Sequence, residues 1–227
     1  MSNDFIKNLR EFNRKERFYV VAAATEGGFT LSEKFKEDVN KKLPLGCEIG
    51  DTAYLAMDYH FDWIYASLFL TWKNQSKKQV FKMPEEDGLI TASPEDVDLL
   101  IAYPDKVNPE KSHLIMIEAK CDTSWTNGQA ISKAKRLESI FGKQNEKWAD
   151  IVTPHYMIWS PEMTKLNPDP FPDWAKDKAK DKDKFHWIEL EMPKDITLKK
   201  IVRRAKSGDK YLEWEVINTT LSEKIDE

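Results

Sequence analysis

Two short apolar runs in the middle of the chain give its clearest pattern of hydrophobic and polar positions. Residues 97–103 and 114–117 are almost wholly apolar, a turn rich in Pro, Asn and Lys separates them, and acidic residues stand at one end of each run. Short apolar runs bounded by turn residues are typical of buried β-strands. The pattern over residues 94–120 therefore predicts two core strands joined as a hairpin.

The acids of this hairpin are placed to converge. Side chains alternate along a strand, so Asp96 and Asp98 share one face, and Glu118 and Lys120 share one face. If the strands are antiparallel neighbours, the carboxylates of Asp98 and Glu118 can lie close enough to share one cation. A buried carboxylate is costly unless a cation pairs with it, so this set predicts a metal site. The alternative is a solvated Glu118–Lys120 pair on an edge strand.

The order of these residues resembles the core of the PD-(D/E)xK nuclease superfamily. An acid in one strand is followed, after a hairpin's length of chain, by Glu118-Ala119-Lys120 at the end of an apolar strand. Residues 95–100 are more similar to the strand of Holliday-junction resolvases and RecB-type nuclease domains than to the literal Pro-Asp form. The resemblance covers about residues 94–133.

The resemblance implies an α/β fold, with a mixed central β-sheet flanked by helices as in restriction endonucleases, and hydrolysis of nucleic-acid phosphodiester bonds that depends on Mg²⁺ or Mn²⁺. Asp98 and Glu118 would bind the metal together with the Ala119 carbonyl, because hard cations prefer oxygen ligands. Lys120 would orient the attacking water or neutralise developing charge. One rival is a catalytically inactive interaction or structural module of the same fold. The other is a small-molecule enzyme.

The helix after the E-x-K strand in that superfamily often brings a Gln and then a Lys or Tyr to the active site. Residues 129–141 predict such a helix, so the resemblance carries Gln129 and Lys133 into the catalytic set. Both residues lie on one face, four positions apart. The alternative is an ordinary polar first turn with a solvated lysine.

Residues 53–72 predict a long helix before the hairpin, because apolar residues recur at helical spacing from Leu55 to Leu70. On such a helix Asp58 and Asp62 lie one above the other. In the superfamily a helix before the core strands commonly brings an extra acid to the metal. We therefore expect Asp62, more than Asp58, to join the metal site, with a solvated helix face as the alternative.

The rest of the chain completes a single domain. Apolar spacing predicts further helices at 3–18 and 30–42 and strands at 151–160 and 187–190. Residues 199–205 and 210–217 predict a β-hairpin, with a helix over 197–206 as the alternative for its first arm. We expect one nuclease-like domain over 1–227, divided into a core at about 53–160, a surface loop at 161–185 and C-terminal strands at 186–218.

The net charge and the cysteine count limit which ligands and partners the chain is expected to bind. The net charge of −4 lacks the basic excess of a dedicated DNA-binding domain, so any nucleic-acid surface must be a local patch. The two cysteines, Cys47 and Cys121, are too few for a disulfide framework or a four-ligand zinc site, and we expect two thiols in a reducing compartment. His155 is expected to be a buried or rim histidine, not a ligand.

No segment predicts a membrane association. The first residues are charged throughout, and no apolar run reaches the length of a signal peptide core or a membrane span. We expect a cytoplasmic protein whose partner is nucleic acid, with DNA preferred to RNA. The sequence does not decide whether the protein forms a homodimer. It also does not decide whether cleavage is endonucleolytic or exonucleolytic.

Overall fold

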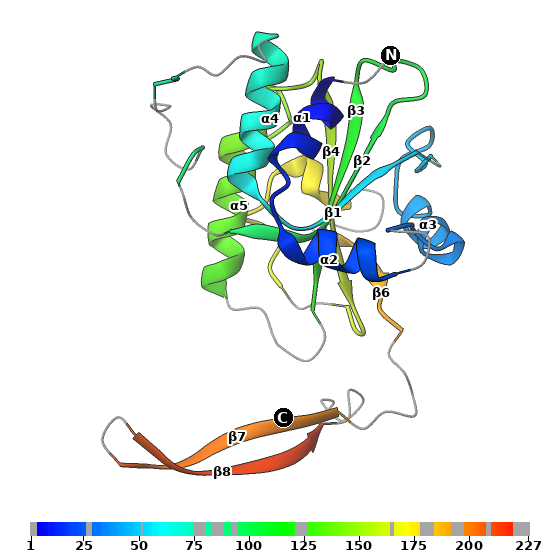
Figure 1. Ribbon diagram of the computed structural model, residues 1–227. Coiled ribbons are helices and arrows are strands. Elements are labelled where there is room, and N and C mark those ends of the chain that lie inside the picture. Colours follow the sequence, from blue (N-terminus) through cyan, green and yellow to red (C-terminus); the bar gives the residue numbers. More distant parts are fainter. Residues whose placement is uncertain are drawn as a thin grey trace.

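The structure is a computed structural model that describes residues 4–25, 29–50, 52–74, 80–82, 89–91, 95–120, 127–163, 166–177, 184–191, 198–207 and 210–219. Within these residues an α/β body is built on a six-stranded sheet, and a separate two-stranded sheet follows it near the C-terminus. Figure 1 shows the sheet of the body nearly edge-on between its helices. The mixed α/β architecture expected from the sequence is confirmed.

The central sheet combines antiparallel and parallel strands. Its order is β1-β2-β3-β4-β6-β5, in which β1, β2 and β3 pair antiparallel, β4 runs parallel to both β3 and β6, and β5 pairs antiparallel with β6. The expected strand pair of residues 94–120 is therefore the β2–β3 hairpin in the middle of the sheet. The strands are β1 (Tyr54–His60), β2 (Asp96–Pro104), β3 (Ser112–Ala119), β4 (Val152–Ser160), β5 (Lys176–Asp177) and β6 (Lys184–Glu189).

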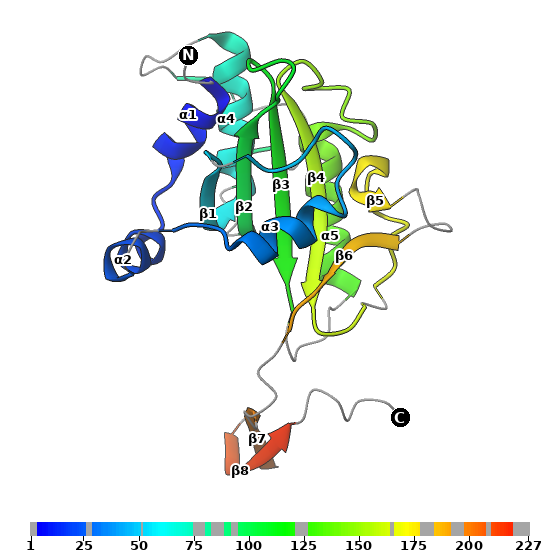
Figure 2. The ribbon, with the colours of Figure 1, turned by 90° about the vertical axis from the view of Figure 1, so that its right-hand side faces the viewer.

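Helices cover both faces of the sheet. α1, α4 and α5 lie on one face, and α3 crosses the other face, in front of β2, β3 and β4 in Figure 2. α2 contacts β1. The helices are α1 (Asp4–Phe12), α2 (Glu16–Ala24), α3 (Glu33–Asn40), α4 (Phe61–Lys73) and α5 (Asn127–Phe141), with a short 3₁₀ helix at Asp173–Ala175.

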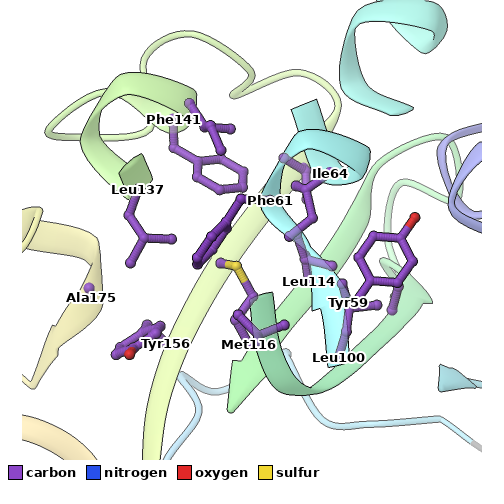
Figure 3. Close-up of a cluster of buried hydrophobic side chains, with 14 of the residues drawn as sticks. Tyr59, Phe61, Ile64, Leu100, Leu114, Met116, Leu137, Phe141, Tyr156 and Ala175 are labelled. Carbon is purple, nitrogen blue, oxygen red and sulfur yellow. The ribbon is translucent and has the colours of Figure 1, made fainter. Parts of the chain in front are cut away.

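The larger core fills the space between the sheet and α1, α4 and α5. Figure 3 shows Phe61 of α4 and Phe141 of α5 over Leu114 and Met116 of β3, all fully buried. These strand residues stand at even positions because alternate side chains share a face. A smaller core on the opposite face contains Ile101, Ile115 and Met157, packed against α3. Both faces of the central strands are therefore buried.

The expectation of one helix over residues 53–72 is wrong. The segment forms β1 first, and α4 begins only at Phe61. Tyr54, Leu55 and Ala56 are all buried because they lie in a strand covered on both faces, and such a strand has no polar alternation to distinguish it from a helix. Asp58 and Asp62 consequently lie in different elements and do not share a helix face.

The N-terminal helix expected over residues 3–18 is interrupted in the structure. Asn13 separates α1 from α2: its side-chain amide donates to the Tyr54 hydroxyl at 3.0 Å, and its side-chain oxygen accepts from the Lys15 N–H at 3.2 Å. Local side-chain bonds of this kind compete with helical backbone bonds. The helix expected at 30–42 is present as α3, where the Ser32 hydroxyl accepts from the Phe35 N–H.

The surface loop expected at residues 161–185 is partly built into the core. Phe171 and Ala175 are buried, and the Phe171 ring packs edge-on against Phe185 at 4.8 Å between ring centroids. Aromatic burial of this size outweighs the polar composition of the flanking chain. The expected loop is therefore wrong for these residues, and 164–165 and 178–183 lie outside the described residues.

The C-terminal hairpin is confirmed, and the alternative helix over 197–206 is wrong. β7 (Leu198–Ser207) and β8 (Lys210–Thr219) pair antiparallel over their whole length. Both ribbon views place this hairpin away from the α/β body. Ile201, Trp214 and Val216 are each at least half exposed on it, so its apolar side chains do not belong to either core.

Candidate active site

Two acids lie close together at one end of the β2–β3 hairpin. Leu99 pairs with Ile117 at the last registered position, and Asp98 and Glu118 are the next residue of each strand. The Asp98 charge is near enough to raise the pKa of the Glu118 carboxyl group. Glu118 lies on the face that carries α5, because Leu114 and Met116, the alternate residues before it on β3, belong to the larger core. The structure therefore brings together the two carboxylates that the sequence nominated.

The Asp98 carboxylate is held by the main chain of β3. The Ala119 backbone N–H donates a hydrogen bond of 2.6 Å to Asp98 Oδ2. This contact crosses from β3 to β2 just beyond the last registered pair, where the ladder would otherwise end. A bond from an amide to a charged acceptor is stronger than a neutral one. Asp98 therefore has one oxygen fixed against Ala119, the residue whose carbonyl was predicted as a metal ligand.

Glu118 is the most deeply buried acid of the site. It is 2% exposed, and burial raises the pKa of its carboxyl group, an effect that the nearby Asp98 increases and Lys133 opposes. Lys133 Nζ lies 2.5 Å from Glu118 Oε2, and Lys120 Nζ lies 3.7 Å from Glu118 Oε1. A charge in this position requires cations around it to remain ionised.

Lys133 joins α5 to the acidic end of the hairpin. Besides contacting Glu118, its ammonium group donates to the Asp96 backbone carbonyl at 2.8 Å. Lys120 lies just after β3, and its backbone N–H donates to the Trp159 carbonyl at 2.9 Å, which holds this end of β3 against β4. Both lysines predicted from the sequence therefore lie beside Glu118. Lys120 comes from the end of β3, and Lys133 comes from α5.

Tyr156 is a residue of this site that the sequence did not indicate. Its hydroxyl is fully buried on β4, and among the described residues it has no hydrogen-bond partner. Burial raises the pKa of Tyr156 well above its usual value, and Glu118 and Asp98 raise it further, which places the hydroxyl within their field. An unpartnered buried hydroxyl beside two carboxylates fits a site that accommodates a further polar group or cation.

Asp62 has a partner of its own. On the first turn of α4, its Oδ1 accepts a hydrogen bond from Arg136 Nη2 of α5 and another from the Thr91 N–H at 3.3 Å. Arg136 is 5% exposed, so this is a buried ion pair between two helices. A role for Asp62 at the metal stays a prediction, and its described partner is Arg136.

Asp58 and Gln129 lie at the margins of the site. Asp58 lies between the registered residues Met57 and Tyr59 of β1 with a left-handed backbone, φ 48°, and its Oδ2 lies 3.2 Å from Arg17 Nη1. Gln129 lies one turn before Lys133 on α5 with an exposed side chain. Its catalytic role stays a prediction.

Compared with known protein families, with curated proteins and with solved structures, the chain shows no match. In the part of the chain that the structure describes, no helix is both long and apolar enough to cross a membrane. The function is therefore argued from the site itself.

Proposed function

We propose that this protein is a metal-dependent nuclease that hydrolyses phosphodiester bonds, with DNA as its expected substrate. The observation that carries the proposal is that Asp98 lies near Glu118 and that Lys120 and Lys133 contact Glu118. These are the residues on which the resemblance to the PD-(D/E)xK superfamily rests. A restriction-endonuclease-like arrangement of the mixed sheet belongs to the same proposal.

The residues of the site fit a hard divalent cation. Asp98 and Glu118 offer carboxylate oxygens from adjacent strands, and the Ala119 carbonyl is the expected third ligand. The buried Tyr156 hydroxyl is close enough for both acids to raise its pKa. When bound there, Mg²⁺ or Mn²⁺ supplies a coordinated water of lowered pKa and neutralises charge on the phosphate.

The chain's own side chains would position the reacting groups. The Ala119 N–H fixes one oxygen of Asp98, and Lys133, at 2.5 Å, favours the ionised form of Glu118 despite its burial. Lys120, 3.7 Å from Glu118, is close enough to orient a water or to place its positive charge beside a phosphate oxygen. Preorganised charges of this kind lower the barrier without reorganising during the reaction.

Exposed basic residues on β7 support a local surface for nucleic acid. Lys199 and Arg203 lie on one face of this strand, and Lys200 and Arg204 lie on the other, where Arg204 also pairs with Glu215 of β8. Phosphate contacts from lysine and arginine supply most sequence-independent affinity for DNA. We include the β7–β8 hairpin in the proposed nucleic-acid surface.

The proposal is tested by digestion of single-stranded, double-stranded and branched DNA and RNA by the purified chain, with Mg²⁺ or Mn²⁺ and with chelator. Cleavage of at least one substrate is expected only with metal, and Asp98→Ala and Glu118→Ala should abolish it while the fold remains intact. Glu110→Ala, in the exposed turn at the other end of the hairpin, is the matched control and should cleave normally. Undiminished cleavage by either active-site variant would contradict the assignment.

The second candidate is an inactive module with the same fold. One observation favours it: Lys133 and the Ala119 N–H already satisfy Glu118 and Asp98 through protein contacts. A purely structural ion pair predicts no cleavage of any substrate and no change in thermal stability on adding Mg²⁺ or Mn²⁺. Metal-dependent cleavage that Glu118→Ala abolishes excludes this candidate.

A further inference from the structure

A second group of metal-ligating side chains lies far from the acidic site. Cys47 in the loop between α3 and β1, His113 on β3 and His155 on β4 bring one ligand atom each to within 4.8 Å of one another. His113 precedes Glu118 by five residues, about 17 Å along a strand at about 3.3 Å per residue. It also projects to the opposite face of the sheet, with the odd-numbered residues of the smaller core.

The spacing of the two histidines matches a tetrahedral metal. His113 Nδ1 lies 3.3 Å from His155 Nε2, and both side chains are buried. Zinc–nitrogen bonds of about 2.0–2.1 Å at a tetrahedral angle place two ligand nitrogens about 3.3–3.4 Å apart. The distance between these two nitrogens is therefore that of two ligands of one zinc ion.

A carboxylate sets the tautomer of His113. Asp105 Oδ1 accepts hydrogen bonds of 2.8 Å from the Val107 and Asn108 N–H groups, and a carboxylate can only accept hydrogen bonds. His113 Nε2 lies 2.8 Å from Asp105 Oδ2 and must be the protonated nitrogen, which leaves a lone pair on Nδ1. A carboxylate behind a histidine in this way is the usual outer support of a zinc ligand.

The other two ligands are also placed to bind. His155 is buried on β4 with its Nε2 towards His113, and a neutral imidazole nitrogen is a zinc ligand. Cys47 is held near the pair because its carbonyl accepts a 2.5 Å hydrogen bond from the Tyr103 hydroxyl, whose ring stacks on His113. Cysteine binds metals as the thiolate, so metal binding by Cys47 must release the thiol proton.

We propose that Cys47 Sγ, His113 Nδ1 and His155 Nε2 bind one Zn²⁺, with water in the fourth position. One thiolate and two imidazoles suit zinc, whereas the oxygen ligands at Asp98 and Glu118 suit Mg²⁺. Binding releases one proton, from the thiol to solvent, and oxidises nothing. The ion joins the α3–β1 loop to β3 and β4, so its expected effect is on stability. This site is independent of the proposed nuclease function.

Two expectations from the sequence change with this proposal. Two cysteines are too few for a site of four cysteine ligands, but one cysteine and two histidines supply three protein ligands. His155, which the sequence analysis did not expect to bind a metal, becomes a ligand. The sequence could not indicate the group, because pairing of β3 with β4 brings the two histidines together and Cys47 comes from the separate α3–β1 loop.

The test is the metal content and cobalt spectrum of the full chain. After dialysis against micromolar Zn²⁺ and then buffer, we expect about one zinc per chain. Substitution with Co²⁺ should give a sulfur-to-cobalt charge-transfer band and the visible bands of four-coordinate cobalt. Both should persist in Cys121→Ser, the matched control for the other cysteine, and the charge-transfer band should vanish in Cys47→Ser.

Asp105→Asn keeps all three ligands and should weaken zinc affinity by about 10- to 100-fold. A chelator should lower the melting temperature of the parent protein, which checks the site without any substitution. A parent chain that retains no zinc, or a cobalt complex without the sulfur band, overturns the proposal and leaves only a hydrogen-bonded Asp105–His113–His155 chain. Equal zinc content in Cys47→Ser and Cys121→Ser also overturns it.

Discussion

Glu118 is the residue at which stability and proposed chemistry conflict most directly. Its carboxylate is 2% exposed, and burial works against its charge. Lys133 reduces that cost from one side and Lys120 from the other. Removing one partner of a buried ion pair is far more damaging than replacing both, because an uncompensated charge remains. The pair therefore makes a quantitative prediction.

Lys133→Met should lower the free energy of unfolding by about 3 kcal/mol, because Glu118 loses its closest cation. Adding Glu118→Gln to this variant should recover part of the loss. Urea denaturation measures both effects. Lys135→Met, at an exposed position of the same helix, is the control and should change little. Equal stability of the Lys133 and Lys135 variants would show that the contact is not a stabilising one.

The sequence predicts that Asp62 joins the metal site. On that prediction Asp62→Asn should weaken the Mg²⁺ dependence or reduce cleavage tenfold or more, about 1.4 kcal/mol in transition-state terms. Asp58→Asn should do less, since its described partner is the exposed Arg17. Because Asp62 also pairs with Arg136, activity must be compared at temperatures where both variants are fully folded. Parent-like activity of Asp62→Asn across a Mg²⁺ titration would leave it a purely structural acid.

At the scale of elements, the sequence predicted best where its patterns were local. β2, β3, β4, α5 and the C-terminal hairpin follow from apolar runs and turns that tertiary contacts reinforce. β1 was mistaken for part of a helix because a strand buried on both faces resembles a helical stripe when read over few residues. Pairing with β2 decides this segment, and that pairing is a long-range contact.

The candidate site divides in the same way. The sequence could predict Asp98, Glu118, Lys120 and Lys133, because two come from one hairpin and the others from the chain just after it. It could not predict Tyr156 or Arg136, the partner of Asp62, because each depends on how separate elements pack. Parallel pairing of β3 with β4, through a crossover that contains α5, leaves no local signal in the sequence.

The packing of α1 gives a prediction for the N-terminal elements. Leu9 is fully buried against the core shared by α1 and α4. Leu9→Ala should therefore lower the free energy of unfolding by about 3 kcal/mol, the usual cost of such a cavity. Leu45→Ala, at a 99% exposed leucine, should change it by less than about 0.5 kcal/mol. Denaturant unfolding followed by circular dichroism measures both, and similar values would mean that α1 is not part of the cooperative unit.

For the whole molecule, charge is distributed unevenly. The net charge is −4, yet β7 carries four exposed basic residues among Lys199–Arg204 and stands with β8 away from the α/β body. A two-stranded ribbon is narrow enough to enter the major groove of DNA. The proposed nuclease function therefore predicts that the hairpin contributes to DNA binding.

Reversing two of these charges should weaken DNA binding in a salt-dependent manner. Lys199→Glu with Lys200→Glu should lower affinity and reduce the slope of log K against log salt by about 0.9 for each lost phosphate contact. The control, Lys143→Glu with Lys147→Glu, makes the same change in net charge at exposed positions after α5. Fluorescence anisotropy at several salt concentrations measures the slope. Identical slopes for the two double variants would exclude the hairpin as the nucleic-acid surface.

The account depends most on the claim that Asp98 and Glu118 together form a divalent-cation site. Titration of the chain with Mn²⁺, followed by the paramagnetic resonance of the unbound ion, tests it directly. We predict about one Mn²⁺ bound per chain through these oxygens, lost in the Asp98→Asn/Glu118→Gln double variant and retained in Glu110→Gln. Binding that is absent from the parent chain, or unchanged in the double variant, would contradict the account.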